Sequence, residues 1–538
     1  MWKKGSLVSA AAAKEPEDTV YRLYYAFRSP LNRVQGHQVL AINRGEREGV
    51  LKVSVEMERE AALIPVRRAV LNPGAPAMAF VRAAAEDAYD RLIFPSVERE
   101  MRSLLTEQAD EGAIKMFGLN LKPLLMQPPV KGFVTMGLDP GYRNGCKVAV
   151  VDATGKVLDT AVVYPTFSQR KKEEAIDTLA KLIRRHGVAH IAIGNGTASR
   201  ETEQMTVELI RRLGGGVSYM IVNEAGASVY SASKLAAEEF PDYDVNLRSA
   251  VSIARRLQDP LAELVKIDPK SIGVGQYQHD MPQARLDETL SGVVEDCVNA
   301  VGVDLNTASA PLLSYVAGLN NTTARNIVKY REENGAFTTR KGVLKVPKLG
   351  PKAFEQCAGF LRVPESRNVL DHTGVHPESY GAAEALLTLC GYGLSDVKAG
   401  GLDGLRERVA AYGEEKAAQA CGVGVPTLRD IVGELMKPGR DPRDELPRPI
   451  LRPDVLEMKN LKAGMELTGT VRNVIDFGVF VDIGVHQDGL VHISQLREGR
   501  RVQHPSEVCA VGDIVTVWVL EVDEKKKRIS LTMKKPKG

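Results

Sequence analysis

The chain has 538 residues, more than one hydrophobic core can serve, so we expect about three to five domains. With 44% hydrophobic residues, 26% charged residues and a formal net charge of +3, it has the composition of a folded globular protein rather than of a disordered or uniformly basic chain. No apolar run approaches the ~20 residues of a membrane-spanning helix and residues 1–13 lack a signal-peptide layout, which predicts a cytoplasmic protein without a membrane partner.

Residues 1–130 are predicted to form a mainly helical leading region. The chain opens with helical character, and one strand is expected over Gly49–Glu56. Apolar residues at helical spacing follow over Met78–Met116. Pro123, Pro128 and Pro129 then indicate a linker, and we predict no chemistry in the region before it.

A change of period after these prolines predicts a second domain over residues 131–252. Three short strands come first, separated by the turns Asp139–Gly141 and Asp152–Gly155, and they predict an antiparallel meander. Helices and strands then alternate, an order typical of the RNase H-like fold. The expected elements are the strands Phe133–Leu138, Lys147–Val151, Val157–Tyr164, His190–Ile193 and Val217–Val222, and the helices Ser168–His186, Ser199–Leu213 and one from about Ser228.

The rest of the chain predicts helical units, a linker and a small barrel. Prolines break the helices of a connector over residues 253–300, helical hairpins follow over 301–365, and a further helical domain covers 366–440. A charged, proline-rich run over 441–460 predicts a linker that isolates the last domain, 461–538. In that domain, short β segments with glycine turns predict a barrel.

Five segments of the last domain resemble the S1 RNA-binding domain. They are Gly464–Val471, Asp476–Ile483, Gly489–Ser494, Val511–Val517 and Arg528–Leu531. S1 domains are five-stranded OB-fold barrels. The fold class predicted for the whole chain is therefore multidomain, α/β plus all-α with a C-terminal all-β OB-fold barrel, in an elongated modular architecture.

Aromatic side chains of this barrel are candidate stacking surfaces for unpaired bases. The S1 resemblance places Phe477, Phe480 and His492 on the binding face, where Arg528 and Lys525–Lys527 would attract phosphates. The alternative is that both phenylalanines belong to the core. Because residues three apart on a strand point to opposite faces, one of the two could be buried. We favour at least one of them as a stacking platform for RNA.

Residues 312–328 and 344–354 resemble two helix-hairpin-helix units. In such a unit the hairpin glycine lets backbone N–H groups approach a phosphate without reading sequence. Asn320 replaces the usual second glycine of the first unit, and Pro351 lacks an N–H group in the second, so weaker phosphate contacts are expected. A scaffold that only packs the modules together is the alternative. The candidate backbone-binding residues are Gly318, Asn320, Lys348, Gly350 and Lys352.

Asp139 and Glu224 stand where RNase H-like nucleases keep metal-binding carboxylates. Two-metal hydrolysis needs about three or four carboxylates around ions ~3.5–4 Å apart. Asn195 occupies a position where an acid is expected, and an amide cannot supply the missing charge. We therefore predict a degenerate, non-enzymatic site, without metal or cofactor, that serves as a scaffold or nucleic-acid surface. The acids that could substitute for the missing ligand are Glu201, Asp259 and Asp268.

Two other patterns resemble a zinc site and a phosphate-binding loop, but neither is predicted to bind a ligand. His372 and His376 have the spacing of a helical zinc site, but Gly374 and Pro377 disfavour a helix and no third ligand follows. Gly214–Gly216 lacks the residues of a phosphate loop and is interpreted as a helix terminator. The six cysteines are scattered without a C-x-x-C pair, which predicts buried free thiols.

The order of a YqgF-like core, tandem hairpins and a terminal S1 barrel, together with several long runs, resembles the bacterial transcription accessory proteins of the Tex family. The resemblance covers nearly the whole chain. Tex proteins carry further helices before the equivalent of Met1, so we expect a short form that lacks the family's N-terminal helical region. The runs that carry the resemblance are Leu138–Tyr142, Val222–Ser228, Arg255–Pro260 and Val375–Glu378.

The resemblance implies a non-catalytic factor that binds RNA, or DNA as a second ligand, near transcribing RNA polymerase. A metal-dependent RNase H-like or RuvC-like nuclease using Asp139 and Glu224 is one alternative, and Asn195 weighs against it. A ribosome-associated translation factor that uses the S1 barrel is another. Nothing in the sequence separates a polymerase partner from a ribosome partner, because S1 barrels serve both.

Overall fold

The computed structural model describes residues 1–13, 17–439, 441–446, 451, 461–485, 487–499, 502, 504–523 and 528–535. It divides into two compact units. The first holds Met1–Leu119 and Val274–Leu290, and the second holds Asn120–Gly273 and Ser291–Gly538. The connector predicted over 253–300 is therefore shared between the units. Among the described residues, no helix is both long enough and apolar enough to cross a membrane.

The first unit contains an antiparallel sheet in the order β2-β1-β3. The strand expected over Gly49–Glu56 is confirmed, but the helical character expected at the start of the chain is wrong, because two strands lie there. Leu7 and Ser9 are buried while their neighbours are not, so the spacing of two is present, but Leu7 is its one large apolar residue. The strands are β1 (Ser6–Ala11), β2 (Ala26–Pro30) and β3 (Leu51–Glu56).

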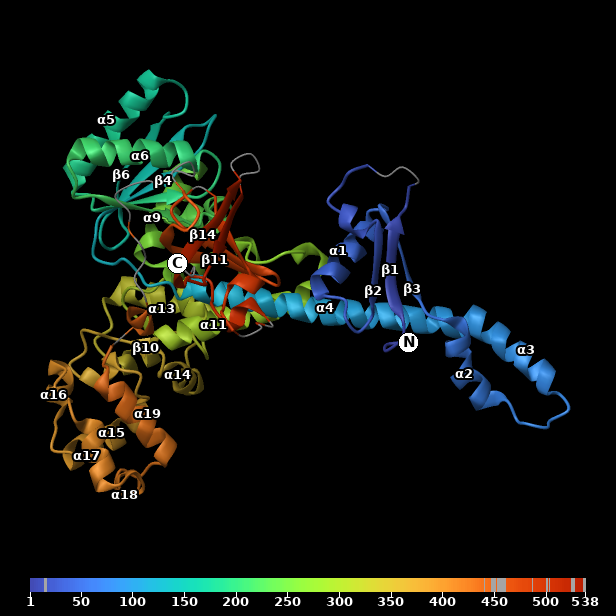
Figure 1. Ribbon diagram of the computed structural model, residues 1–538. Helices are drawn as coiled ribbons and strands as arrows, with labels where there is room; N and C mark the ends of the chain where they lie inside the picture. Colours follow the sequence, from blue (N-terminus) through green and yellow to red (C-terminus); the bar gives the residue numbers. More distant parts are fainter. Residues whose placement is uncertain are drawn as a thin grey trace. The chain divides into compact units, whose positions relative to one another are not determined.

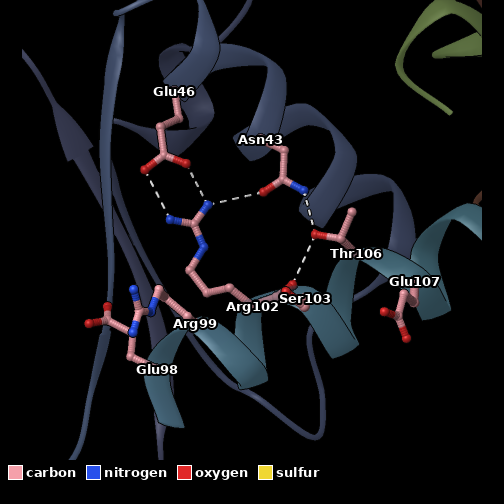
Figure 2. A pocket seen from close by; sticks show the side chains of 8 residues that line it. All are labelled: Asn43, Glu46, Glu98, Arg99, Arg102, Ser103, Thr106 and Glu107. Carbon is pink, nitrogen blue, oxygen red and sulfur yellow. Dashed lines mark hydrogen bonds and ion pairs between the residues drawn. The ribbon is translucent and has the colours of Figure 1, made fainter. Parts of the chain in front are cut away.

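A polar network fastens the first helix of this unit to its longest helix. The helices are α1 (Gly36–Arg47), α2 (Arg59–Val70), α3 (Met78–Ala88), the π-helix η2 (Tyr89–Ile93) and α4 (Phe94–Leu125), whose last turn belongs to the second unit. Arg102 on α4 donates to both carboxylate oxygens of Glu46 on α1, at 2.9 and 2.5 Å, and to Asn43. Asn43 donates to Thr106 at 2.9 Å, and these residues line a groove of about 740 Å³ (Figure 2).

The segment Val274–Leu290 is held in the first unit by charged side chains. Asp280, in the short helix η4 (Gln278–Asp280), accepts a hydrogen bond from Arg44 Nε at 2.6 Å and pairs with Arg47. The Arg44 guanidinium also lies over the Tyr277 ring, 4.9 Å from its centroid. The first unit is thus completed by residues that follow it by more than a hundred positions in the chain.

A five-stranded sheet in the order β6-β5-β4-β7-β8 organises the next part of the chain (Figure 1). The first three strands form the predicted antiparallel meander, and β7 and β8 then pair in parallel beside β4. All the strands and helices expected here are confirmed to within a few residues. They are β4 (Thr135–Asp139), β5 (Cys146–Val151), β6 (Val157–Val163), α5 (Gln169–His186), β7 (His190–Gly194), α6 (Ser199–Leu213), β8 (Ser218–Val222) and α7 (Ala227–Ser231).

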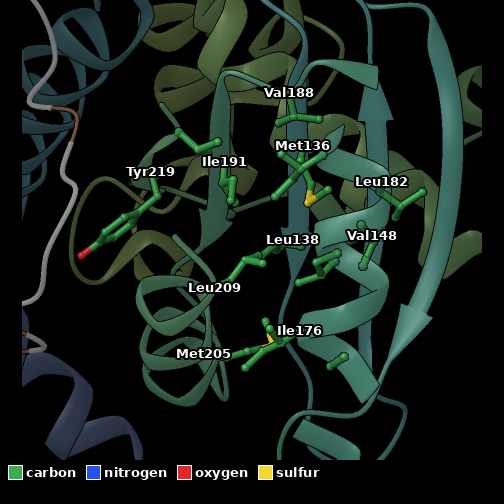
Figure 3. Packing of buried hydrophobic residues seen from close by; sticks show 14 of the residues in the cluster. Met136, Leu138, Val148, Ile176, Leu182, Val188, Ile191, Met205, Leu209 and Tyr219 are labelled. Carbon is green, nitrogen blue, oxygen red and sulfur yellow. The ribbon is translucent and has the colours of Figure 1, made fainter. Parts of the chain in front are cut away.

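Helices cover the two faces of this sheet. Apolar residues of α5 and α6 pack on one face, in a core that includes Met136, Ile176 and Leu209 (Figure 3). The helix α9 (Val245–Gln258) packs on the other face against Ala149 and neighbouring residues. This approach is close: a Cβ added to Gly137 would lie 2.1 Å from the Ala250 carbonyl oxygen, so only glycine fits there.

Helices, most of them short, and two two-residue strands make up the described chain between the sheet and the barrel. Arg340, which is fully buried, joins the hairpin region to the domain after it by donating to the backbone oxygens of Val375, at 2.7 Å, and Asp371. The elements are α8 (Lys234–Glu239), α10 (Pro260–Leu264), η3 (Pro269–Ile272), α11 (Gln283–Val301), β9 (Val303–Asp304), α12 (Ala310–Ser314), α13 (Asn321–Asn334), η5 (Arg340–Lys345), α14 (Pro351–Cys357), β10 (Leu361–Arg362), η6 (Val369–His372), η7 (Pro377–Ser379), α15 (Tyr380–Leu389), α16 (Leu394–Ala399), α17 (Leu405–Tyr412), α18 (Glu414–Ala420) and α19 (Val425–Met436).

The described part of the predicted linker is docked on the second unit rather than free. In η8 (Pro442–Glu445), the Arg443 side chain is 1% exposed and donates to Asp259 at 2.7 Å and to Asp441 at 2.9 Å. Leu451 packs against apolar residues of β7, β8 and α9. The prediction that this run isolates the barrel is therefore wrong for its described residues, because a buried ion pair anchors it.

The chain ends in the predicted five-stranded closed barrel, in the order β11-β12-β13-β15-β14. Branched apolar residues on the inward faces of the strands fill it, among them Val479, Val481 and Val517, which are fully buried, and Ile529 and Leu531 of the last strand. The strands are β11 (Glu466–Ile475), β12 (Gly478–Asp482), β13 (Gly489–His492), β14 (Ile514–Asp523) and β15 (Arg528–Thr532). Within the second unit, Asn120 donates to Asn473 at 3.3 Å, so the barrel lies against the end of α4.

Candidate nucleic-acid interface

The two predicted carboxylates lie at the same edge of the five-stranded sheet. Asp139 ends β4 and Glu224 follows β8, with β7 between the two strands. Burial raises the pKa of Asp139 to about 6; the charge of Glu224 adds to the rise and the ammonium group of Lys147 opposes it. Lys147 is the direct partner of Asp139 in the β4–β5 pair. The first carboxylate therefore has a basic side chain as its neighbour.

Glu224 rests on the turn that contains Asn195. A Cβ added to Gly196 would lie 1.7 Å from Glu224 Oε1, so the carboxylate occupies the space that a larger residue would need. Asn195 Oδ1 accepts a hydrogen bond from the Glu224 backbone N–H at 3.0 Å. Asn195 thus has a structural role: it ties the loop after β7 to the loop after β8.

A buried arginine stands beside Glu224. Arg256 on α9 is 4% exposed and donates from Nη1 to the backbone oxygens of Asn223, at 2.7 Å, and Ala225, at 2.8 Å. Burial raises the pKa of Glu224, while the Gly196 backbone N–H and the charge of Arg256 lower it. Burial lowers the pKa of Arg256 to about 10. Each of the two carboxylates therefore has a cation in its surroundings, but burial outweighs that cation and the pKa of both acids is raised. Glu224 Oε2 and Arg256 Nη2 are buried without a hydrogen-bond partner among the described residues.

The acids that could complete a metal site each have a partner, and the partner of Glu201 lies in the loop after Asp139. Glu201 accepts a hydrogen bond from the Tyr142 hydroxyl at 3.0 Å. Asp259 caps α10 and pairs with Arg443, and Asp268 caps η3 through the Lys270 N–H. Over the ranges that the structure describes, no three His, Cys, Asp or Glu side chains form a group that could hold a metal ion.

The run Arg255–Pro260 fixes loops around the sheet. Arg255 Nε donates to the Gly155 carbonyl at 2.8 Å, and Gln258 Nε2 donates to the carbonyls of Asp152 at 2.7 Å and Phe133 at 3.0 Å. Together with Arg256, these side chains hold the loops before β4, between β5 and β6, and after β8. The residues of this run therefore support the fold, because their side chains donate to backbone carbonyl groups of these loops.

On the barrel, three of the predicted residues gather on the outer surface. Phe477 lies in the turn between β11 and β12 and is 44% exposed. Phe480 is half-buried and alternates with the fully buried Val479 and Val481, so it points outward. His492 is exposed and pairs with Gly478, one residue after Phe477. Neither phenylalanine belongs to the barrel core, so the alternative that placed them there is wrong.

Arg528 lies on the same outer face but at a distance from His492. Leu490 pairs with both Phe480 and Ser530, which defines a row across three strands. His492 follows this row by two residues and Arg528 precedes it by two, so they are about 13 Å apart along the strands. The predicted cluster is thus an extended face. Lys525–Lys527 lie outside the described residues.

The two hairpins differ in how their turns are built. Gly318 and Lys348 both have the left-handed backbone that the turn requires, with φ of +81° and +66°. In the first hairpin, the Asn320 side chain accepts from the N–H groups of Thr322 and Thr323 and so caps α13 itself. In the second hairpin, Gly350 leaves α14 without a side-chain cap and a Cβ there would meet open space. Lys352 follows on the exposed surface.

Sequence reasoning missed two further hairpin turns in the domain over 366–440. Gly391–Gly393 precedes α16 and Gly422–Gly424 precedes α19, and the first glycine of each has positive φ, +73° and +70°. Each turn follows a cysteine, so the string Cys-Gly-x-Gly occurs twice. That repeat is the signal that would have revealed them.

Models of known protein families match five stretches of the chain. The Tex central region-like model matches residues 1–117, so the expectation that the family's N-terminal helical region is missing is not supported. The other matches are the Tex protein YqgF-like domain over 133–258, the helix-hairpin-helix motif over 298–362, the HHH domain over 368–443 and the S1 RNA binding domain over 460–534.

Similar proteins occur in bacteria and in animals. The chain is 52% identical to the uncharacterised protein YdcI of Bacillus subtilis, over 99% of this chain and 74% of that protein. It is 38% identical to human S1 RNA-binding domain-containing protein 1, over 98% of this chain and 59% of that protein. It is 50% identical to the transcriptional accessory protein Tex of Neisseria gonorrhoeae, over 99% and 70% of the two chains. The chain therefore belongs to the Tex family.

Proposed function

We propose that the protein is a non-catalytic transcription accessory factor that binds single-stranded RNA, with DNA as a second ligand, mainly through the outer face of its barrel. The observation that carries this proposal is the exposure of Phe477, 44% in a turn next to His492 and Phe480. Aromatic rings in this setting stack on bases at about 1–3 kcal/mol each. Arg528, at the far side of the same face, would contact the phosphates of a strand that crosses it.

Binding of this kind should tolerate sequence and respond to salt. Stacking rings accept any base, and arginine contacts to phosphate release counterions, so affinity falls as salt rises. The test is a titration of labelled single-stranded RNAs of unrelated sequence at several salt concentrations. Similar affinities that fall together with salt support the proposal. A flat salt response, or strong preference for one short sequence, contradicts it.

The hairpins are proposed as a weaker, second contact with the nucleic-acid backbone. Asn320 satisfies the N–H groups of its own helix, so the first hairpin, with Gly318, offers little to a phosphate. The second hairpin keeps Lys348, Gly350 and Lys352 exposed on one turn. Replacing Lys348 and Lys352 by glutamine should reduce affinity several-fold, less than loss of the barrel face, and should reduce the salt slope by about two.

We infer that the sheet carrying Asp139 and Glu224 does not hydrolyse nucleic acid. Lys147 and Arg256 supply positive charge beside the two acids, and Asn195 is committed to the Glu224 backbone. The protein should leave single-stranded, duplex and four-way-junction substrates intact in Mg²⁺ or Mn²⁺. Cleavage that disappears in Asp139→Asn would establish the nuclease alternative.

The proposed partner is RNA polymerase. Support comes from the name of the Neisseria gonorrhoeae relative, a transcriptional accessory protein, at 50% identity. Crosslinking in cells, followed by identification of bound RNA and protein, tests this choice. Recovery of polymerase subunits with nascent transcripts supports it, and recovery of ribosomal proteins with ribosomal RNA would replace it by the translation alternative.

A further inference from the structure

The turn that carries Phe477 is held from two sides. On one side, the Phe477 carbonyl accepts a hydrogen bond from the Ile493 N–H at 2.9 Å, which fixes the turn to the end of β13. On the other side, the Asp476 carboxylate lies 3.3 Å from His504 Nε2. His504 precedes the short helix η11 (Pro505–Glu507), which belongs to the connection between β13 and β14. The residue next to the exposed ring is thus tied to a different loop of the barrel.

The hydrogen bonds of His504 define which ring nitrogen carries the proton. The Ser506 backbone N–H donates to His504 Nδ1 at 3.2 Å, and an N–H group can only donate. Nδ1 therefore accepts and carries no proton, so the neutral ring is protonated at Nε2. The Nε2–H group then donates to Asp476 Oδ1. His504 acts as a bridge that uses one nitrogen to cap its own helix and the other to hold the turn.

The same local unit occurs at His492. The Ser494 backbone N–H donates to His492 Nδ1 at 3.3 Å, which again leaves the proton on Nε2. His492 is on the exposed outer face of the barrel, whereas the protonated nitrogen of His504 donates to Asp476. The barrel therefore uses one His-x-Ser unit on the proposed binding face and another to support the neighbouring turn.

We propose that Asp476 and His504 are positioning residues for RNA binding: their hydrogen bond holds the Phe477 ring in the orientation that receives a base. This inference rests on the proposed function and adds two residues to it. A ring in an exposed turn loses rotational freedom when it stacks on a base, and a turn that is already fixed loses less. Loss of the link should therefore weaken binding by about 3- to 10-fold without unfolding the barrel.

The experiment uses the full chain and variants that separate the link from the cap and from charge. His504→Asn keeps an oxygen that can cap η11, but its side chain is too short to reach Asp476. Asp476→Asn removes the charge and keeps an oxygen that accepts from Nε2, whereas Asp476→Ala removes both. Affinity for an oligouridine of about 12 nucleotides is measured by fluorescence anisotropy, and thermal melting is recorded in parallel.

The expected result is a ranking of affinities with unchanged melting. His504→Asn and Asp476→Ala should each bind about 3- to 10-fold more weakly than the parent, and Asp476→Asn within about twofold of it. Equal affinities for Asp476→Ala and Asp476→Asn would overturn the proposal, because charge alone would then explain the effect. If His504→Asn melts at a much lower temperature, the comparison of the two Asp476 variants still decides.

A double-mutant cycle with Phe477→Ala separates this inference from the function on which it rests. If the link acts only through the ring, His504→Asn should cost less than about 1.5-fold once Phe477 is absent. A full loss in that background would mean that His504 acts by another route and would overturn the inference. If Phe477→Ala alone binds as tightly as the parent, the proposed stacking site itself fails.

Discussion

The carboxylate site of the sheet and the outer face of the barrel differ in how far their functional side chains are exposed. Asp139 and Glu224 are half-buried, and basic side chains from β5 and α9 lie near them. Phe477 and His492 are exposed, and the hydrogen bonds around them come from neighbouring turns that leave the rings open. In the first site burial outweighs the nearby positive charge and raises the pKa of both acids, whereas the second site offers its side chains to a ligand.

This difference is the reason for our proposal that the retained acidic residues do not make a reactive centre. A carboxylate that already has a cation beside it must lose that neighbour before a metal ion can take its place. An exposed ring on a rigid barrel needs no such exchange to stack on a base. The comparison predicts that mutations at the sheet change stability, while mutations at the barrel face change binding.

The largest expected effect is the loss of the cation beside Glu224. Arg256→Ala should lower the free energy of unfolding by about 3 kcal/mol, because it removes two hydrogen bonds and leaves a buried carboxylate without its neighbouring charge. Chemical denaturation measures the loss. Arg255→Ala is the matched control: it also removes two hydrogen bonds, but its side chain is 21% exposed and Glu239 keeps Lys266 as a partner, so it should cost less, about 1–2 kcal/mol. Little loss for Arg256→Ala, with melting of the parent raised by Mn²⁺, would indicate an open metal site and break the comparison.

Removal of the barrel tests the other side of the comparison. Deletion of 461–538 should weaken binding of single-stranded RNA by about 100-fold, which corresponds to about 2.7 kcal/mol. Arg443 and Leu451 remain in this truncated chain, so its docked segment is kept. Circular dichroism and melting show whether the remainder is folded. If the truncated chain is folded and its RNA affinity is nearly unchanged, the main binding site lies in the hairpins rather than in the barrel.

Single substitutions on the barrel face sharpen the comparison further. Replacing Phe477, Phe480 or His492 by alanine should cost about 1–3 kcal/mol of binding for each residue that stacks. Since Phe477 is the most exposed phenylalanine of the barrel, its substitution should leave the melting temperature unchanged. Phe480 is half-buried, so its substitution should lower both the RNA affinity and the melting temperature. A collapsed melt for Phe477→Ala would show that the ring supports the fold, since a buried Phe costs ~3–5 kcal/mol of stability.

The sequence predicted the elements whose pattern is local. Strands β4 to β8 have apolar runs bounded by glycine and aspartate turns, and α5 begins at Ser168, which caps it, and ends at Gly187 with φ of +66°. The outward direction of Phe480 also follows from a period of two beside Val479 and Val481. Such features depend on neighbours in the chain, and their positions were predicted to within a few residues.

The features that the sequence did not predict depend on partners far along the chain. Arg443 lies in a charged, proline-rich run that resembles an exposed linker, and only its contact with Asp259 makes it buried. Arg256 follows another arginine in an amphipathic helix, and its role comes from loops more than thirty residues earlier. The strand β1 pairs with β2 and β3, and its small residues resemble those of a helix.

The smallest effect is expected at Asp139, and its sign follows from the direction of the pKa shift. The pKa rises from 3.8 to about 6 on folding, so between these values the folded protein holds a proton that the unfolded chain releases. The contribution of this group to stability is therefore lost as pH rises through the window from about 4 to 6, and at pH 7 the buried charge is a cost. Asp139→Asn removes that cost.

The variant should be more stable than the parent by about 1–2 kcal/mol at pH 7, less than the full shift because Lys147 loses its neighbour. Near pH 4 the parent is itself protonated at Asp139, so the difference should approach zero. Urea denaturation of both proteins at pH 4, 5, 6 and 7 measures it. A gain that does not depend on pH would assign the effect to packing rather than to charge. A loss at pH 7 would show that the Asp139–Lys147 attraction outweighs burial, and the Asp139 charge would then stabilise the fold rather than cost stability.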